Sequence, residues 1–90
     1  MIETYRTVDG RDYFLFRFER RPRVIRIYVL KQPSYGARPE DGHSTHRYVD
    51  EHGQHYICWD GSCRDMQEAH QVAKAWAERT QQYVRTGRRF

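Results

Sequence analysis

YFLFRFERRPRVIRIYVL, residues 13–30, is the stretch that decides the fold. Phenylalanine recurs at every second position in its first half, and β-branched residues are frequent in its second half. Both features are typical of strands that bury one face. The segment Arg20-Arg21-Pro22 interrupts the apolar pattern and predicts a turn. We therefore expect two paired antiparallel strands, at about residues 13–19 and 23–30.

The register of this hairpin determines which side chains share a face of the sheet. A two-residue turn flanked by residues 19 and 22 pairs Phe16 with Ile25 and Phe14 with Ile27. The core face then carries Phe14, Phe16, Ile25, Ile27 and Val29. The opposite face carries a mixture of aromatic, basic and aliphatic side chains, namely Tyr13, Leu15, Arg17, Val24, Arg26, Tyr28 and Leu30.

Further strands are predicted on both sides of this hairpin. Residues 2–8 read as a first strand, which the Asp9-Gly10 pair ends in a tight turn. A second hairpin is expected at residues 46–49 and 55–59, where pairing of Tyr48 with Tyr56 directs Val49, Ile57 and Trp59 to the core. Between the hairpins, residues 32–45 are rich in proline and glycine and predict a long loop.

The C-terminal third predicts one amphipathic helix, at about residues 63–85. Its apolar stripe recurs at steps of three and four residues, at Met66, Ala69, Ala73, Trp76, Thr80 and Tyr83. Ser62 is the expected cap, Asp65 follows three positions later, and Gly87 supplies the stop before a frayed tail at residues 87–90. The fold class is therefore α+β: one domain, residues 1–90, with an antiparallel sheet of about four to five strands covered on one face by a single helix.

Composition and charge narrow the class of protein. The formal net charge is +4, and seven basic residues lie between Arg11 and Lys31, whereas seven acidic residues lie between Glu40 and Glu68. No apolar run approaches the roughly 18 residues of a membrane span, so we expect a cytoplasmic protein with no membrane partner. The two cysteines, Cys58 and Cys63, are interpreted as reduced thiols.

The sequence favours binding over catalysis. Four histidines and both cysteines fall within residues 43–63, but their spacing fits no standard zinc pattern, so we expect no metal and no cofactor. Cys63 lies near the N-terminus of the predicted helix, where a thiol pKa can be lowered, yet no nucleophile signature surrounds it. The glycines are isolated and form no phosphate-binding loop. We therefore predict no enzymatic activity.

A helix can cover only one side of the sheet, which leaves the other side to a partner or to the loop at residues 32–45. Tyrosine and arginine are enriched in interface hot spots and also form stacking platforms for single-stranded nucleic acid. We predict that partners contact this face and the adjoining basic hairpin tip, through Tyr13, Arg17, Arg20, Arg21, Arg23, Arg26, Tyr28, Tyr48 and Tyr56.

Three hypotheses about the partner stay open at this point. The first is a larger protein or nucleoprotein on which the chain docks as an accessory inhibitor or adaptor of the kind that phages and plasmids encode; segregated charge favours it slightly. The second is nucleic acid, bound by the basic and aromatic hairpin. The third is a second copy, bound through the uncovered face or an edge strand.

The chain has strands followed by a helix at about Met66 to Val84. In this order of elements it resembles the last part of a double-stranded-RNA-binding domain or a three-stranded integrase arm-binding domain. The helix lacks the lysines expected at the start of the first, because it opens with Arg64-Asp65. The resemblance is one of topology, and it assigns no family.

Overall fold

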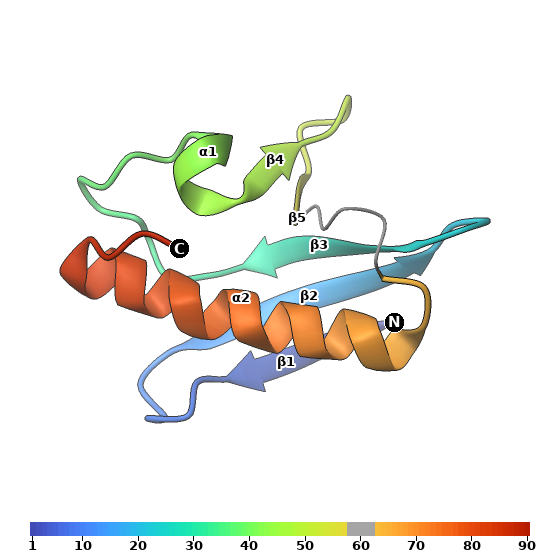
Figure 1. Cartoon of the computed structure of the whole chain (residues 1–90), viewed down its shortest axis with the longest axis horizontal. Helices are drawn as coiled ribbons and strands as arrows, with labels where there is room; N and C mark the ends of the chain where they lie inside the picture. The colour runs from blue at the N-terminus through green and yellow to red at the C-terminus, as the bar shows by residue number, and fades with distance from the viewer. Residues whose placement is uncertain (58–62) are drawn as a thin grey trace.

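The computed structural model describes residues 1–57 and 63–90. It confirms the α+β fold: a five-stranded antiparallel sheet in the order β1-β2-β3-β5-β4 with a long C-terminal helix against it (Figure 1). The strands are β1 (Ile2–Arg6), β2 (Tyr13–Arg20), β3 (Ile25–Lys31), β4 (Arg47–Val49) and β5 (His55–Ile57).

The long helix α2 (Met66–Thr86) lies across β2 and β3. Its N-cap is Asp65, whose carboxylate accepts the backbone N–H of Glu68, so the helix begins three residues later than predicted. Ser62, the expected cap, lies outside the described residues. Gly87 ends the helix as predicted, because its φ of 77° is a left-handed conformation that glycine adopts without strain.

The β2–β3 hairpin corrects the predicted register but preserves the faces. The two-residue turn is Pro22-Arg23, closed by a hydrogen bond from the Arg21 amide to the Val24 carbonyl, and Phe16 therefore pairs with Val29. Proline has no N–H for the ladder and is preset for the first position of a turn, which explains why the turn forms two residues further on. The residue paired with Phe16 therefore shifts by four positions, from Ile25 to Val29. Because four is an even number, the same side chains face α2.

The core lies between this face and the helix. Phe14, Phe16 and Ile27 are essentially inaccessible, and Trp76 of α2 meets the first two rings edge-on at 5.8 and 6.2 Å. The predicted core residues on β2, β3 and α2 are confirmed, and Ile57 joins them. Val49 was expected in the core but is 57 % exposed, because β4 is a three-residue edge strand. Trp59 lies outside the described residues.

The turn between β1 and β2 is longer than the predicted Asp-Gly pair. Strand β1 ends at Arg6, and the turn is closed by the hydrogen bond from the Thr7 amide to the Asp12 carbonyl. The buried amide of Gln81 on α2 donates to the hydroxyl of Thr7 and to the carboxylates of Asp9 and Asp12. Hydrogen bonds from the Arg11 amide, Gln81 and Thr7 lower the pKa of Asp9 to about 2. A polar junction thus fixes the turn to the helix.

The loop at residues 32–45 packs beside the C-terminal half of α2 rather than over the second face of the sheet. It contains a short helix, α1 (Gly42–Thr45), which the sequence did not predict. The Trp76 indole donates to the Thr45 carbonyl at 2.9 Å, and the Tyr83 hydroxyl donates to the Pro39 carbonyl at 2.8 Å. The guanidinium of Arg47 on β4 lies 5.0 Å from the ring centre of Tyr35 and pairs with Glu40.

The C-terminal segment contacts this layer. Phe90 packs beside the core, its ring centre lies 5.0 Å from that of His46, and its carbonyl is 2.5 Å from the His46 Nε2 atom. Among the described residues, no helix is long and apolar enough to cross a membrane.

Candidate docking face

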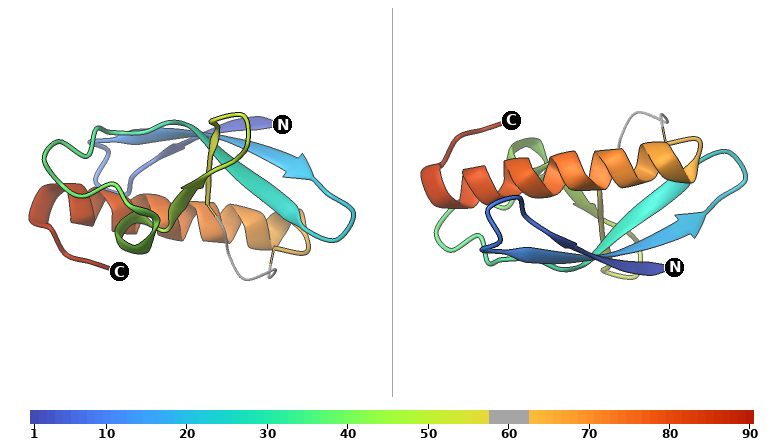
Figure 2. Two further views of the ribbon diagram at one scale, coloured as in Figure 1. Left: turned by 90° about the horizontal axis from the view of Figure 1, so that it is seen from above. Right: turned by 90° about the horizontal axis from the view of Figure 1, so that it is seen from below.

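The side of the sheet that faces away from α2 carries six of the residues predicted to bind a partner, namely Tyr13, Arg17, Arg26, Tyr28, Tyr48 and Tyr56, and the other three, Arg20, Arg21 and Arg23, lie at the hairpin tip. In the two views of Figure 2 the helix lies on one side of the sheet, and the turn between β4 and β5 arches over the other. The strand register places Arg17 opposite Tyr28, Tyr28 opposite Tyr56, and Tyr56 opposite Tyr48. These four side chains form one row across β2, β3, β5 and β4, which we call the arginine–tyrosine row.

The row is held together by ring and guanidinium contacts. The Cζ atom of Arg17 lies 4.5 Å from the ring centre of Tyr28, and Arg26 lies 4.4 Å from that of Tyr56. The rings of Tyr28 and Tyr56 meet edge-on at 6.3 Å, and those of Tyr56 and Tyr48 are tilted at 6.0 Å. Such pairs stabilise one another and hold the side chains in fixed orientations.

Tyr28 lies on the expected face but is only 2 % exposed, which corrects the expectation that it is open to solvent. Its hydroxyl accepts a hydrogen bond from Arg21 at 2.9 Å and donates to the Asp50 carboxylate at 3.3 Å. Arg17 covers its ring and also donates to Gln54 at 3.1 Å. The β4–β5 turn, which supplies Asp50 and Gln54, therefore closes over the middle of the row. Tyr48, at 38 % exposure, remains accessible at its end.

The arginines of this face are balanced by nearby carboxylates. Glu19 pairs with Arg17 at 3.4 Å and with Arg21 at 3.2 Å. Burial opposes ionisation of Asp50, but hydrogen bonds from the amides of Gln54 and His52 and from the Tyr28 hydroxyl lower its pKa. Asp50 is therefore charged beside Tyr28 at neutral pH. The middle of the face is electrically balanced rather than strongly basic.

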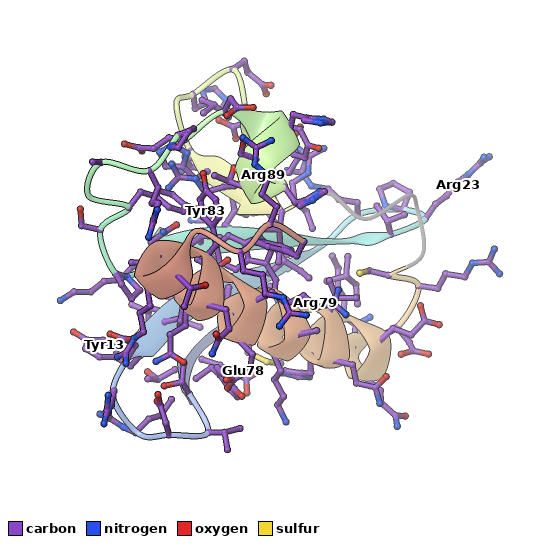
Figure 3. All side chains as sticks on the ribbon, turned by 60° about the vertical axis from the view of Figure 1, so that its left-hand side comes forward. Tyr13, Arg23, Glu78, Arg79, Tyr83 and Arg89 are labelled. Atoms are coloured by element: carbon purple, nitrogen blue, oxygen red, sulfur yellow. The ribbon has the colours of Figure 1, made fainter. Side chains whose placement is uncertain are left out.

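The hairpin tip differs from the rest of the face. Arg20 and Arg23 are exposed, and within the described part of the chain neither takes part in an ion pair. Figure 3 shows Arg23 extending from the end of the projecting β2–β3 hairpin into solvent. Arg21, between them, folds back to Glu19 and Tyr28 instead. The tip thus presents two unneutralised guanidinium groups.

Tyr13 lies at the opposite end of β2, about 13 Å from Arg17 at the usual rise per strand residue. Its ring is 39 % exposed and is approached by Arg6 at 5.8 Å and by the Lys31 ammonium at 5.4 Å. Leu30 is nearby and 42 % exposed, where the ladder between β2 and β3 shifts register at a bulge. Tyr13 thus belongs to a separate basic and apolar end of the face and does not contact the row.

Sequence reasoning missed the polar residues that fix the row. Glu19 follows Arg17 by two positions, so alternation along a strand already places both on one face, and their pairing could have been found. Asp50 and Gln54 could not have been found in this way, because their role depends on how the β4–β5 turn curls over the sheet.

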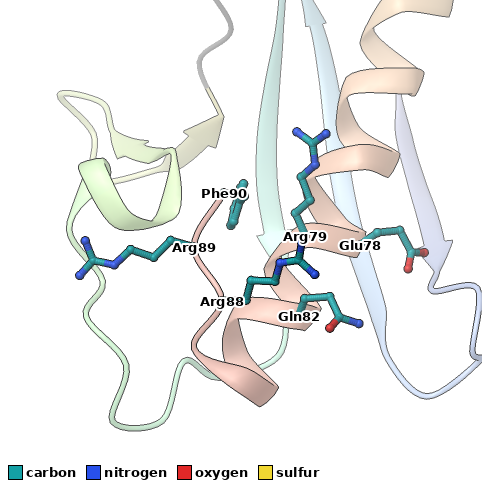
Figure 4. Close-up of a pocket in the computed structure, with 6 residues that line it drawn as sticks. All are labelled: Glu78, Arg79, Gln82, Arg88, Arg89 and Phe90. Atoms are coloured by element: carbon teal, nitrogen blue, oxygen red, sulfur yellow. The ribbon is translucent and has the colours of Figure 1, made fainter.

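The other candidate sites do not assemble. No group of three or more His, Cys, Asp or Glu side chains is placed to hold a metal ion among residues 1–57 and 63–90. Cys63 is buried in the core cluster, and Cys58 lies outside the described residues. A cavity of about 330 Å³ lies between α2 and the chain end, but Arg89 points away from Arg79 and Arg88 there, so its guanidinium groups do not converge (Figure 4).

Comparisons with protein-family models, with curated proteins and with solved structures found no match for this chain. The class of protein must therefore be argued from the geometry of the face alone.

Proposed function

We propose that the chain is a non-enzymatic binding module that docks on a larger protein or nucleoprotein partner through the arginine–tyrosine face of its sheet. In this role it acts as an accessory inhibitor or adaptor of that partner. The observation that carries the proposal is the arginine–tyrosine row itself, which stands on the side of the sheet that neither α2 nor the loop at residues 32–45 covers.

The rigidity of the row supports a role in binding. Side chains that are already fixed lose little conformational entropy when a partner arrives, which leaves more of the contact energy as affinity. The Tyr56 ring contacts Tyr28 and Arg26. Tyr48 and Arg26 therefore pack against a ring that is itself held in place. Tyrosine and arginine in this setting are the residue types that dominate interface hot spots.

The local charge balance favours a protein over bare nucleic acid. Nucleic-acid binding draws most of its affinity from arginine and lysine that neutralise phosphates. Here Arg17 and Arg21 are already paired with Glu19, and the β4–β5 turn brings the Asp50 carboxylate to the Tyr28 hydroxyl beside them. A phosphate backbone over this face would have to approach these carboxylates. A protein surface with its own mixture of charges has no such restriction.

One observation favours the alternative that nucleic acid is the partner. Arg20 at the end of β2 and Arg23 in the turn are both exposed, and Arg23 projects beyond the sheet (Figure 3). A protruding basic ribbon of this kind can contact phosphates or enter a groove. In this alternative the tip, and not the row, makes the principal contacts.

Paired variants test the proposal. Tyr48→Ala with Arg26→Ala removes the accessible end of the row and the guanidinium that lies over the Tyr56 ring, while Gln71→Ala with Lys74→Ala on the exposed side of α2 is the matched control. Each form is immobilised and used to capture partners from the native host, and the recovered partner is then purified and titrated by calorimetry. We expect about 2 kcal/mol or more of binding free energy to be lost in the first pair and none in the control.

A retained affinity in the first pair would contradict the docking face. Replacement of Arg20 and Arg23 by Gln distinguishes the alternative. If nucleic acid is the partner, this change weakens binding to all sequences alike, and each lost phosphate contact lowers the log–log salt slope by about 0.7 to 0.9.

A further inference from the structure

The outer edge of β1 lies outside the arginine–tyrosine row and is open to pairing with another strand. β1 is the first strand in the sheet order, and within the described residues only β2 pairs with it. Hydrogen bonds join Met1 to Phe18 at one end and Thr7 to Asp12 at the other, in a constant register. In an antiparallel ladder the bonded positions alternate, so Glu3 and Tyr5 point their amides and carbonyls at β2. The remaining backbone groups of the strand point outward.

The outward positions are Ile2, Thr4 and Arg6. Their side chains are exposed and lie on the face away from α2, whereas Glu3 and Tyr5 turn toward the helix and contact His70 and Glu78. The edge strand contains no proline and no bulge, two of the devices that prevent a sheet edge from pairing, and its one outward charge, Arg6, lies at the end of the strand. The opposite edge, β4, offers three residues, so β1 is the longer of the two free edges.

The sequence of β1 is complementary to itself in one register. Antiparallel pairing of two copies must join outward positions to outward positions, since these carry the free backbone groups. The register centred on Thr4 does this: Thr4 meets Thr4 of the second copy, and Ile2 meets its Arg6 at both ends. Each of these pairs exchanges two backbone hydrogen bonds.

We infer that β1 joins two copies of this chain into a two-fold symmetric dimer with one continuous sheet. Each chain contributes its five strands, and the dyad passes between the two Thr4 residues. Such an interface is isologous, because the same strand is used by both copies.

Side-chain chemistry supports a second copy as the occupant of this edge. No like charges meet across the dyad, since Arg6 faces Ile2 and Glu3 faces Tyr5 in this register. Threonine pairs are favourable cross-strand neighbours in an antiparallel sheet. The helix packs mainly on β2 and β3 and contacts β1 through the inward side chains Glu3 and Tyr5, whereas the outer edge of β1 lies at the margin of the molecule in Figure 1.

The first test introduces a charge at the dyad. The mass in solution is measured by sedimentation over a range of concentrations. We expect the unaltered chain to be a dimer. Thr4→Lys should weaken the dimer about tenfold or more, because two ammonium groups then face each other, and Thr4→Glu should do the same. A mixture of the two variants should recover a heterodimer of near wild-type affinity. Gln67→Lys on the exposed side of α2 is the control and should leave the dimer unchanged.

Disulfide trapping is the second test, and it reports the register. Directly opposed residues of a hydrogen-bonded pair have Cα atoms about 5.5 Å apart, within the range of a disulfide. Thr4→Cys, with Cys58 replaced by Ser, should therefore give a covalent dimer under mild oxidation. Ile2→Cys is the matched control: its symmetry mate lies four positions along the strand, about 13 Å away, and should not cross-link.

A monomer at all concentrations would overturn the inference, and so would a dimer that Thr4→Lys leaves intact. Equal cross-linking of the two cysteine variants would overturn the register. Circular dichroism of each variant shows whether the monomer fold is retained. None of these outcomes bears on the docking face, because no residue of the arginine–tyrosine row is altered.

Discussion

Tyr28 provides the sharpest test of the structure of the docking face. Exposure of this side chain, as the sequence suggested, would make Tyr28→Ala a mild change. The structure instead places the ring under Arg17 at 4.5 Å and beside Tyr56, with the hydroxyl between Arg21 and Asp50. Removal of the ring empties a buried aromatic position and also separates the polar groups that close over it.

The expected magnitude follows from these contacts. Truncation of a buried aromatic side chain to alanine costs about 3 to 5 kcal/mol of unfolding free energy. Tyr28→Phe keeps the ring and removes two hydrogen bonds whose partners, Arg21 and Asp50, can be rehydrated, so about 1 kcal/mol should be lost. Tyr48→Ala at the accessible end of the row should cost about 1 kcal/mol or less, since much of its ring is already in water.

Urea denaturation followed by circular dichroism measures all three variants on one scale, provided that the m-values agree. The expected order of destabilisation is Tyr28→Ala, then Tyr28→Phe and Tyr48→Ala together. If Tyr28→Ala unfolded no more easily than Tyr48→Ala, the β4–β5 turn would not cover the row. The interpretation that carboxylates balance the arginines of this face would then be wrong.

Three further predictions concern the rest of the fold. Trp76→Ala and Phe16→Ala should each lower the unfolding free energy by about 3 to 5 kcal/mol in urea titrations, because both rings are fully buried in the core. Gln81→Leu should cost about 1 to 3 kcal/mol by the same measurement, since it leaves the polar junction at the β1–β2 turn without its donor; a neutral effect would refute the junction. Burial and the hydrogen bond to Glu78 raise the pKa of Tyr5 to about 12 from 10.0, so the folded state keeps a proton that the unfolded state loses. Its contribution to stability is therefore complete below pH 10 and should disappear toward pH 12, a loss that thermal melts should show in the native chain but not in Tyr5→Phe.

The sequence predicted which side chains of β2 and β3 share a face, and it predicted the register of β4 with β5, but it did not predict the register of β2 with β3. Phenylalanine at every second position of β2, at Phe14, Phe16 and Phe18, determines which side chains face α2 in any register that shifts by an even number. The position of the turn depends on Pro22, because its missing N–H excludes it from the ladder and favours it in the turn itself. Helix α2 was predictable for most of its length because its apolar residues recur at regular steps of three and four over a long stretch.

The accessibility of the docking face could not be predicted, because it depends on contacts between segments far apart in the chain. Tyr28 is buried through Asp50 and Arg17, which approach it only once β3 pairs with β5 and β2. The loop at residues 32–45 could have lain on either side of the sheet. Its place beside α2 is determined by Trp76 and Tyr83, whose polar atoms find carbonyl partners in the loop.

The dimer inferred from β1 has a consequence for docking. Paired residues in an antiparallel ladder share a face, so both arginine–tyrosine rows lie on one side of the continuous sheet and both copies of α2 on the other. Two rows that face the same way can engage a partner with repeated binding sites, and the second contact is then intramolecular. Thr4→Lys should therefore weaken retention on a densely immobilised partner by tenfold or more, while its affinity for the same partner free in solution, measured by calorimetry, should equal that of the native chain. Surface plasmon resonance at high and low partner density supplies the comparison, with Gln67→Lys as the control. Equal retention of Thr4→Lys and the native chain at both densities would show that the two rows do not act together.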